Sequence, residues 1–218
     1  MSTENEKNNL AVGGGVVLIA VAVAVIVIVW WVLTSKNKST VKSVTYNGPD
    51  NPDFQCADSK DEGCTLRNSK NEPNFIFSEQ WQLPHENSGS FFFNVNGKGN
   101  GLIIYLVSQP TITSETKGYA IVLDDQQKSY VNTDVEMVGR AAGPGINRDF
   151  TLDVPTDIVV CYGSSRLSVY ARNEKILEVT TQNEPVPYFG FGLLRNDKQG
   201  VIIKDIKVSE ECVQSGDY

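Results

Sequence analysis

Four cysteines are the residues of this 218-residue chain whose chemistry is easiest to assign. Cys56 and Cys64 bracket seven residues of an acidic loop. Cys161 lies in the apolar run DIVVCYG, and Cys212 follows the last apolar run. The absence of a C-x-x-C pair argues against zinc. Of the three pairings that four cysteines allow, we expect Cys56 with Cys64 as a loop clasp and Cys161 with Cys212 as a tie for the C-terminal tail. The alternative is four free thiols, with Cys161 packed in the core.

Candidate catalytic groups are few. His85 is the single histidine and lies in the turn-like stretch QLPHENSG, and no G-x-S-x-G elbow is present to suggest a serine hydrolase. Asp134 and Glu136 share one face of an expected strand, and Asp124 and Asp125 lie at a strand end. Such carboxylates are the groups that glycoside hydrolysis needs, but they fit a solvated strand face equally well. We therefore expect that the chain is not an enzyme.

Metal, cofactor and phosphate sites are not predicted. The stretch DNPDFQCADSKDEG is rich in oxygen ligands, but counting from Asp58 places Lys60 at the third position and Ser69 at the twelfth, which does not fit a calcium loop. Neither Lys-Ser/Thr nor a helix follows NGKGNG, so it is not a phosphate loop. The net charge of −7 repels phosphate backbones, so we expect no nucleic-acid partner.

Short β-branched and aromatic runs follow one another from Phe75 onward, and Gly, Pro, Asn or Asp separates most of them. No helical stripe appears there, so the pattern predicts an all-β, antiparallel β-sandwich of the jelly-roll or concanavalin-like kind. RLSVYARN and EKILEV are expected to form a hairpin with Asn173 and Glu174 near its turn. GLIIYLV is apolar on both faces and predicts a central strand. GVIIKDIKVS has mixed faces, which indicates a strand that is flanked on both sides or lies near an edge.

Three segments, GYAIVLDDQQKSYV, RDFTLDVPTDIVVCYGSSRLSVYARNEKILEV and PVPYFGFGLLRNDKQGVIIKDIKV, occur in an order that resembles the concanavalin A-like sandwich group. Within that group the chain is similar to the domain named after farnesoic acid O-methyltransferase, over roughly Phe75 to Val208. The resemblance implies a non-catalytic recognition or adhesion module. The chain also lacks the strand, glycine-rich loop and helix that hold a nucleotide-like cofactor. Trp81 is the single tryptophan of the expected domain, so no binding residue is carried over.

An uncharged run of 24 residues, Leu10 to Leu33, is long enough to span a bilayer as a helix, and Trp30 and Trp31 lie where an interfacial aromatic belt is expected. A cleaved signal peptide fits less well, because the start MSTENEKNNL is mildly acidic and the apolar run is too long. Association of such helices is a further option, since small residues recur at a spacing of four. These are Ala11 with Gly15 and Ala20 with Ala24.

The side of the membrane on which the sandwich lies is left open by two conflicting signals. Lys36, Lys38 and Lys42 follow the span whereas Lys7 precedes it, which favours a cytoplasmic C-terminal domain. Disulfides indicate an oxidising space instead. One solution is a surface recognition module on the extracellular face. The other is a virion component, made in the cytoplasm and lying between membrane and capsid.

The chain is thus expected to comprise an N-terminal tail (1–9), a transmembrane helix (10–33), a juxtamembrane stalk with the disulfide-clasped loop (34–74) and the sandwich (75–218). We expect a non-enzymatic protein that binds or scaffolds protein or glycan partners at a lipid bilayer. The alternative is a carbohydrate-binding or glycoside-hydrolase-like lectin-fold protein. The expected contact surfaces are the loop between Cys56 and Cys64 and the turns LPHENSG, GPGINRDF and LLRNDKQG.

Overall fold

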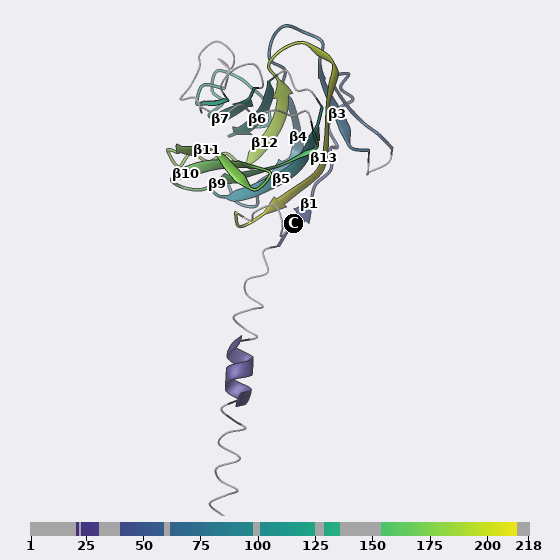
Figure 1. Cartoon of the computed structure of the whole chain (residues 1–218). Coiled ribbons are helices and arrows are strands. Elements are labelled where there is room, and N and C mark those ends of the chain that lie inside the picture. Colours follow the sequence, from purple (N-terminus) through teal and green to yellow (C-terminus); the bar gives the residue numbers. More distant parts are fainter. Residues whose placement is uncertain are drawn as a thin grey trace, which may run out of the picture. The chain divides into compact units, whose positions relative to one another are not determined.

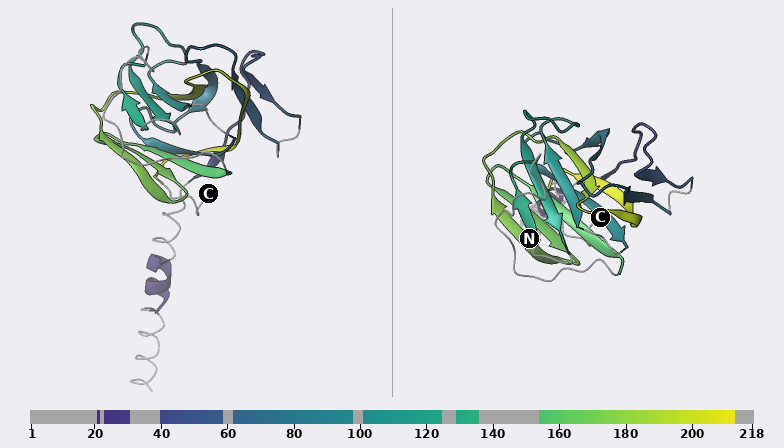
Figure 2. Two further views of the ribbon diagram at one scale, coloured as in Figure 1. Left: turned by 45° about the horizontal axis from the view of Figure 1, so that its top comes forward. Right: turned by 90° about the horizontal axis from the view of Figure 1, so that it is seen from above.

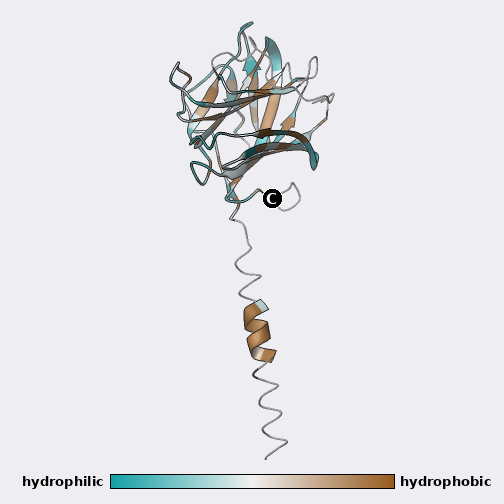
Figure 3. Cartoon of the chain, turned by 90° about the vertical axis from the view of Figure 1, so that its left-hand side faces the viewer, coloured by the Kyte–Doolittle hydropathy of each residue, from teal (hydrophilic) through white to brown (hydrophobic). Residues whose placement is uncertain are grey.

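The computed structural model describes residue 21 and residues 23–30, 40–58, 62–97, 101–124, 129–135 and 154–212. The chain divides into two units, Met1–Ser39 and Thr40–Tyr218. In the first unit, residues 23–30 are helical and their side chains are apolar (Figure 3). Within the described residues, no helix combines the length and the hydropathy that a membrane crossing requires. Trp31 and the remainder of the Leu10–Leu33 run lie outside the described residues, so the transmembrane helix stays a prediction.

The second unit is a β-sandwich of two antiparallel sheets (Figures 1 and 2). The larger sheet has the strand order β11-β10-β9-β5-β13-β3-β2, with β1 also paired to β13, and the smaller sheet has the order β4-β12-β6-β7-β8. The strands of the larger sheet are β1 (Lys42–Ser43), β2 (Phe54–Cys56), β3 (Cys64–Asn68), β5 (Gly89–Asn96), β9 (Thr156–Tyr162), β10 (Arg166–Ala171), β11 (Glu174–Thr180) and β13 (Asp197–Ser209). Those of the smaller sheet are β4 (Ile76–Gln82), β6 (Leu102–Val107), β7 (Gly118–Leu123), β8 (Tyr130–Asn132) and β12 (Tyr188–Leu193).

The main core draws apolar side chains from both sheets. Phe91 of β5 stacks on Phe189 of β12 with ring centroids 4.3 Å apart. Phe93 of β5 meets Phe191 of β12 edge-on at 4.9 Å. These four positions alternate along their strands, so the period of two in GSFFFNV and PYFGFG places their rings in the interior. The predicted sandwich is therefore confirmed, and aromatic contacts join its two layers.

The sandwich begins earlier in the chain than Phe75, where the sequence analysis placed it. Strands β1, β2 and β3 belong to the larger sheet, so much of the expected stalk is part of the compact unit. Phe54 and Leu66 are register partners in β2 and β3, and both are buried. The sequence indicates one short strand in this region, over Val41–Tyr46, and β1 lies within it. β2 and β3 are not predicted, because they are short and each carries few apolar residues, which leaves no sustained alternation to detect.

Two local predictions are confirmed in the strand details. The β10–β11 hairpin turns at Arg172 and Asn173, whose φ angles of 50° and 66° match a two-residue turn with left-handed central residues. β6 lies between β12 and β7, at the centre of the smaller sheet. The mixed pattern of β13 also has a cause: β13 is paired on both sides, and its register shifts between Lys204 and Lys207 at Asp205, whose φ is 55°.

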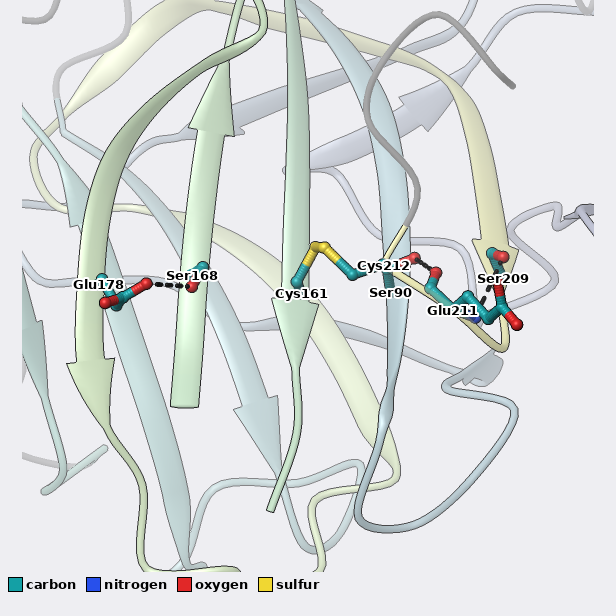
Figure 4. The surroundings of a disulfide bond; sticks show 7 residues. All are labelled: Ser90, Cys161, Ser168, Glu178, Ser209, Glu211 and Cys212. Carbon is teal, nitrogen blue, oxygen red and sulfur yellow. Dashed lines mark hydrogen bonds between the residues drawn. A yellow bond between two sulfur atoms is a disulfide. The ribbon is translucent and has the colours of Figure 1, made fainter. Parts of the chain in front are cut away.

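Both disulfides join the cysteines as predicted. Cys56 and Cys64 are direct partners on β2 and β3. Cys161 of β9 is bonded to Cys212, which follows β13 (Figure 4). Beside this second bond, the Ser90 hydroxyl donates to the backbone oxygen of Glu211 over 2.5 Å. The segment after β13 is therefore fastened across the larger sheet.

Separate removal of the two disulfides should have unequal effects. The bonds enclose sequence separations of 51 residues (Cys161–Cys212) and 8 residues (Cys56–Cys64). We expect the double alanine variant of the first pair to lose about 4 kcal/mol of unfolding free energy and that of the second about 2.5 kcal/mol, because loop entropy grows with loop length. Urea denaturation of the full chain followed by circular dichroism measures both. A larger loss from the short loop would contradict the expectation.

Candidate functional site

An open cavity of about 680 Å³ lies beside β4. Residues from three segments line it: Tyr46–Pro49 with Asn51, Phe75 with Phe77–Gln80, and Pro110–Ile112. We call it the β4 groove. Phe75 is 37% exposed, and Phe75 and Val154 are the large hydrophobic side chains that the described part of the sandwich leaves exposed. An exposed aromatic ring at the wall of a cavity is a feature of binding sites rather than of packing.

The aromatic wall of the β4 groove rests on a buried tyrosine. The rings of Phe75 and Phe77 lie 5.3 and 5.7 Å from the ring of Tyr105 on β6. Burial, with a smaller contribution from Tyr130, raises the pKa of Tyr105 well above its usual value. The Tyr105 hydroxyl therefore stays protonated, and it donates to the backbone oxygen of Asn74 over 3.3 Å. This contact ties the start of the Phe75 segment to the centre of the smaller sheet.

Two glycines of β12 make room for this wall. A Cβ at Gly190 would collide with the Phe77 ring, and a Cβ at Gly192 would collide with the backbone oxygen of Asn74 and crowd Tyr105. The sequence YFGFG thus alternates core phenylalanines with glycines on the opposite face of the strand. Because no side chain rises from β12 at these two positions, the Phe77 ring packs directly on the sheet.

The polar part of the β4 groove comes from a bulge in β4. Gln82 pairs with Tyr188 and Phe77 with Gly190, so residues 78–81 lie opposite the single residue Phe189. The extra residues bring Glu79 and Gln80 out as consecutive exposed side chains, whereas a regular strand would bury one of them. Bulges of this kind are frequent beside binding and active sites, where they redirect side chains.

Across the β4 groove, the segment Tyr46–Asn51 supplies amide and hydroxyl groups. Asn47 Nδ2 donates to Gln80 Oε1 over 3.0 Å, and both residues are exposed. Burial, and to a smaller extent the charge of Asp50, raise the pKa of Tyr46, so its hydroxyl remains a donor. It donates to the backbone oxygen of Pro49 over 2.9 Å. The segment is thus held in place by its own contacts and by β4.

The predicted carboxylates are not gathered into one site. Asp124 is fully buried, and both of its oxygens accept hydrogen bonds from Arg195, over 3.0 and 2.5 Å. Asp124 is therefore engaged in a structural ion pair that joins the end of β7 to the segment after β12. Asp134 lines a different cavity, of about 350 Å³, together with Glu184. Glu184 faces Lys117 at 4.0 Å. Asp125 and Glu136 lie outside the described residues.

The remaining predicted contact regions have mixed outcomes. His85 is exposed in a turn closed by a bridge to Ser88. The disulfide-clasped loop borders a cavity of about 390 Å³ beside β13. In LLRNDKQG, Asp197 is buried and accepts backbone hydrogen bonds from Gln199 and Gly200. GPGINRDF lies outside the described residues.

Within the described ranges, no three His, Cys, Asp or Glu residues lie close enough together to hold a metal ion.

The sequence analysis missed the β4 groove, although one signal for its aromatic wall exists. In NFIFS, Phe75 and Phe77 alternate with Ile76 and Ser78, which are buried. The period of two therefore places two phenylalanines on the face opposite the core, where polar residues are expected. The Tyr46–Asn51 side has no comparable signal, because its nearness to β4 arises from tertiary structure alone.

No protein-family model matches the chain, and no curated protein matches its sequence. Solved structures do match its fold. The exoplasmic/lumenal domain of VIP36 in its Ca²⁺/Man2-bound form is 16% identical, with a TM-score of 0.53 over 81% of this chain and 91% of that chain. Its Ca²⁺/Man3GlcNAc-bound form is 15% identical, with a TM-score of 0.52 over 81% and 85%. A Trypanosoma rangeli sialidase mutant displaying trans-sialidase activity is 10% identical, with a TM-score of 0.50 over 83% and 32%.

These likenesses establish the fold, a concanavalin-like, lectin-type β-sandwich, as the sequence predicted. At such identities they do not establish an activity. The finer resemblance to the farnesoic acid O-methyltransferase-like domain stays a prediction.

The structural role of Asp124 can be tested by removing its partner. Arg195→Met removes the cation that bonds both oxygens of this buried carboxylate, and we expect a loss of about 3 kcal/mol in unfolding free energy. Lys175→Met is the control, because it removes an exposed ion pair to Glu178 and should leave the denaturation midpoint unchanged. Urea titrations of both variants decide the point. Equal midpoints would show that the Arg195–Asp124 pair contributes no more than a surface contact.

Proposed function

We propose that this chain is a non-enzymatic carbohydrate-binding protein that recognises glycans in the β4 groove. The observation that carries the proposal is the exposed Phe75 ring beside Phe77, at the wall of a cavity that also presents planar amides. The apolar C–H face of a pyranose ring fits against an aromatic face, whose π-electrons carry negative charge. Phe75 and Phe77 supply that face, and the buried Tyr105 behind them holds it in position.

The amides of the groove complement the hydroxyls of a sugar. The hydrogen bond from Asn47 to Gln80 uses one donor and one acceptor, which leaves Asn47 Oδ1 as an acceptor and Gln80 Nε2 as a donor. Neither atom bonds another described residue. An acceptor and a donor held side by side suit neighbouring hydroxyls of one sugar, each of which donates and accepts.

Charge narrows the class of glycan. Glu79 is the single charged residue among the described residues that line the groove, and the chain as a whole is acidic. Sialylated and sulfated glycans bring a second negative charge, which the groove has no cation to neutralise. Neutral glycans are therefore the class that we propose. The lectin-type fold shared with VIP36, whose structures hold mannose glycans, supports this proposal.

We also propose that the Leu10–Leu33 segment anchors the sandwich in a membrane, with the glycan on the extracellular face. Its length and its paired tryptophans support the anchor, and the two disulfides support the extracellular face. The virion scaffold is less well supported, because the comparisons lead to glycan-binding folds and the described surface offers a groove. A virion scaffold would be expected to bury its surface against neighbouring proteins rather than to bind ligands.

Glycoside hydrolysis is the second candidate, and one observation favours it. Asp134 and Glu184, from two different segments of the chain, line the same cavity. Two carboxylates around one cavity are the minimum that glycosidases use. The cavity lies apart from the β4 groove, with which it shares no lining residue. Glu184 also faces Lys117, which suits a solvated surface.

Replacement of Phe75 tests the proposed function. The full chain in detergent is screened on an array of neutral, sialylated and sulfated glycans, and the affinity of each hit is measured by calorimetry. We expect neutral hits, and we expect Phe75→Ala to weaken them about tenfold, or about 1.4 kcal/mol, because it removes the stacking face. Val154→Ala is the matched control, since it removes an exposed apolar side chain elsewhere. No binding to any glycan, or equal affinity of Phe75→Ala and the parent chain, would overturn the proposal.

Incubation with the bound glycan separates binding from hydrolysis. We expect the glycan to be recovered intact after prolonged incubation with the full chain, as read by mass spectrometry. Two results together would refute the non-enzymatic assignment: release of shorter products by the parent chain, and loss of that release in Asp134→Asn. Glu86→Gln, an exposed carboxylate outside the Asp134 cavity, serves as the control variant.

A further inference from the structure

A second cavity adjoins the β4 groove. It measures about 610 Å³ and continues along β4 toward Pro84. The two cavities share Glu79 and Gln80, the two side chains that the β4 bulge turns outward. Because the same side chains form the wall of both, the cavities are two parts of one surface feature. We call them together the β4 cleft.

One continuous segment forms the opposite wall of the β4 cleft. Residues Thr40–Thr45 line the second cavity, and Tyr46–Asn51 line the β4 groove. The start of this segment is bonded to the larger sheet: Ser43 pairs with Lys207, and Val44 N donates to Ile206 O over 2.9 Å. Farther along, Asn47 is bonded to Gln80 of the smaller sheet. The segment therefore bridges the two sheets and runs alongside β4.

The bridging segment is packed as well as bonded. The Tyr46 ring lies 4.8 Å from Phe54 and 5.3 Å from Trp81, both of which are buried. A wall with such contacts is already in position before a ligand arrives, so binding does not have to order it. The β4 cleft is thus a preformed trough between two parallel rims.

The chemistry changes along the length of the cleft. The β4 groove carries the aromatic wall, whereas the second cavity is lined mainly by hydroxyls, amides and charged groups, among them Thr45, Gln82 and Lys42. Gln82 Nε2 donates to the backbone oxygen of Glu79 over 2.6 Å, which leaves its amide oxygen as an acceptor. The first part suits the stacking of one sugar ring, and the second suits hydrogen bonds to further sugars.

We infer that the β4 cleft binds a linear oligosaccharide, with one sugar on Phe75 and the following sugars along Gln80 and Gln82. The inference rests on the proposed function and adds the length and direction of the ligand. The seven residues of β4 lie opposite four residues of β12, Tyr188–Phe191, so the edge of β4 extends about 13 Å at about 3.3 Å per residue. That distance exceeds the reach of a single sugar. The ligand class is therefore an unbranched chain of several units, whose sugar on Phe75 is neutral.

Titration with oligosaccharides of increasing length tests the inference. The full chain is titrated with neutral homo-oligomers of mannose, glucose, xylose and N-acetylglucosamine, each from one to six units. We expect the affinity to rise at least tenfold between the single sugar and the longest oligomer of the preferred sugar. Gln82→Ala should weaken the long oligomers about fivefold and leave the single sugar unchanged, whereas Phe75→Ala should weaken both. Gln199→Ala, which removes an exposed glutamine that lines neither cavity of the cleft, is the control.

The outcomes separate the two proposals. Equal affinity for the single sugar and for the long oligomers would overturn the extended cleft and leave glycan binding in place. So would a Gln82→Ala variant that binds long oligomers as well as the parent chain does. Absence of binding to every oligomer and to the glycan array would overturn both proposals together. Circular dichroism of each variant confirms that the fold is retained before titration.

Discussion

The packing around Trp81 is the contact on which the candidate site depends. Its ring meets Tyr46, Phe54 and Phe191 at 5.3, 5.4 and 5.1 Å, so one side chain joins the bridging segment, β2 and β12. Trp81 Nε1 is buried with no hydrogen-bond partner among the described residues. Such an unpaired donor costs about 1–3 kcal/mol. Burying about 200 Å² of a large aromatic side chain returns about 5 kcal/mol, so the packing outweighs the cost. With Trp81 fixed inward, the neighbouring β4 residues Gln80 and Gln82 are exposed at the edge.

Two asparagines connect this packed region to the start of the Phe75 segment. Asn68 at the end of β3 donates to the backbone oxygen of Leu193 over 2.9 Å, and Asn74 accepts from the Leu193 amide over 2.7 Å. Asn74 also donates to the backbone oxygen of Arg67. The larger sheet, through β3, is therefore bonded to β12 of the smaller sheet immediately before Phe75. The two sheets contribute different features: the larger sheet carries both disulfides, and β4 of the smaller sheet lines the β4 groove.

The features that the sequence predicted are those with a local signal. The sandwich follows from alternating apolar runs. The β10–β11 hairpin follows from the turn expected near Asn173 and Glu174, which the structure places one residue earlier, at Arg172 and Asn173. The disulfide pairing was predicted from the loop positions of three of the cysteines. The errors and omissions concern contacts between distant segments. The sequence predicts a stalk where β2 and β3 lie, because their apolar residues, such as Phe54 and Leu66, are isolated in sequence. Asp124 and Arg195 are 71 residues apart, so nothing local connects them. The cleft likewise needs the fold to bring residues 40–51 beside β4.

The bridging segment has a mechanical consequence. It is the first part of the sandwich in the chain, so tension on the residues before Thr40 passes directly into it. β1 pairs with β13 through two residues, Lys42 and Ser43, whereas Tyr46 beyond it is packed on two buried rings. We therefore expect a pulling force to separate β1 from β13 before it displaces Tyr46. A ligand that contacts both walls of the β4 cleft would bear part of this force. Ligand binding would therefore also raise the resistance of the bridging segment to being pulled away.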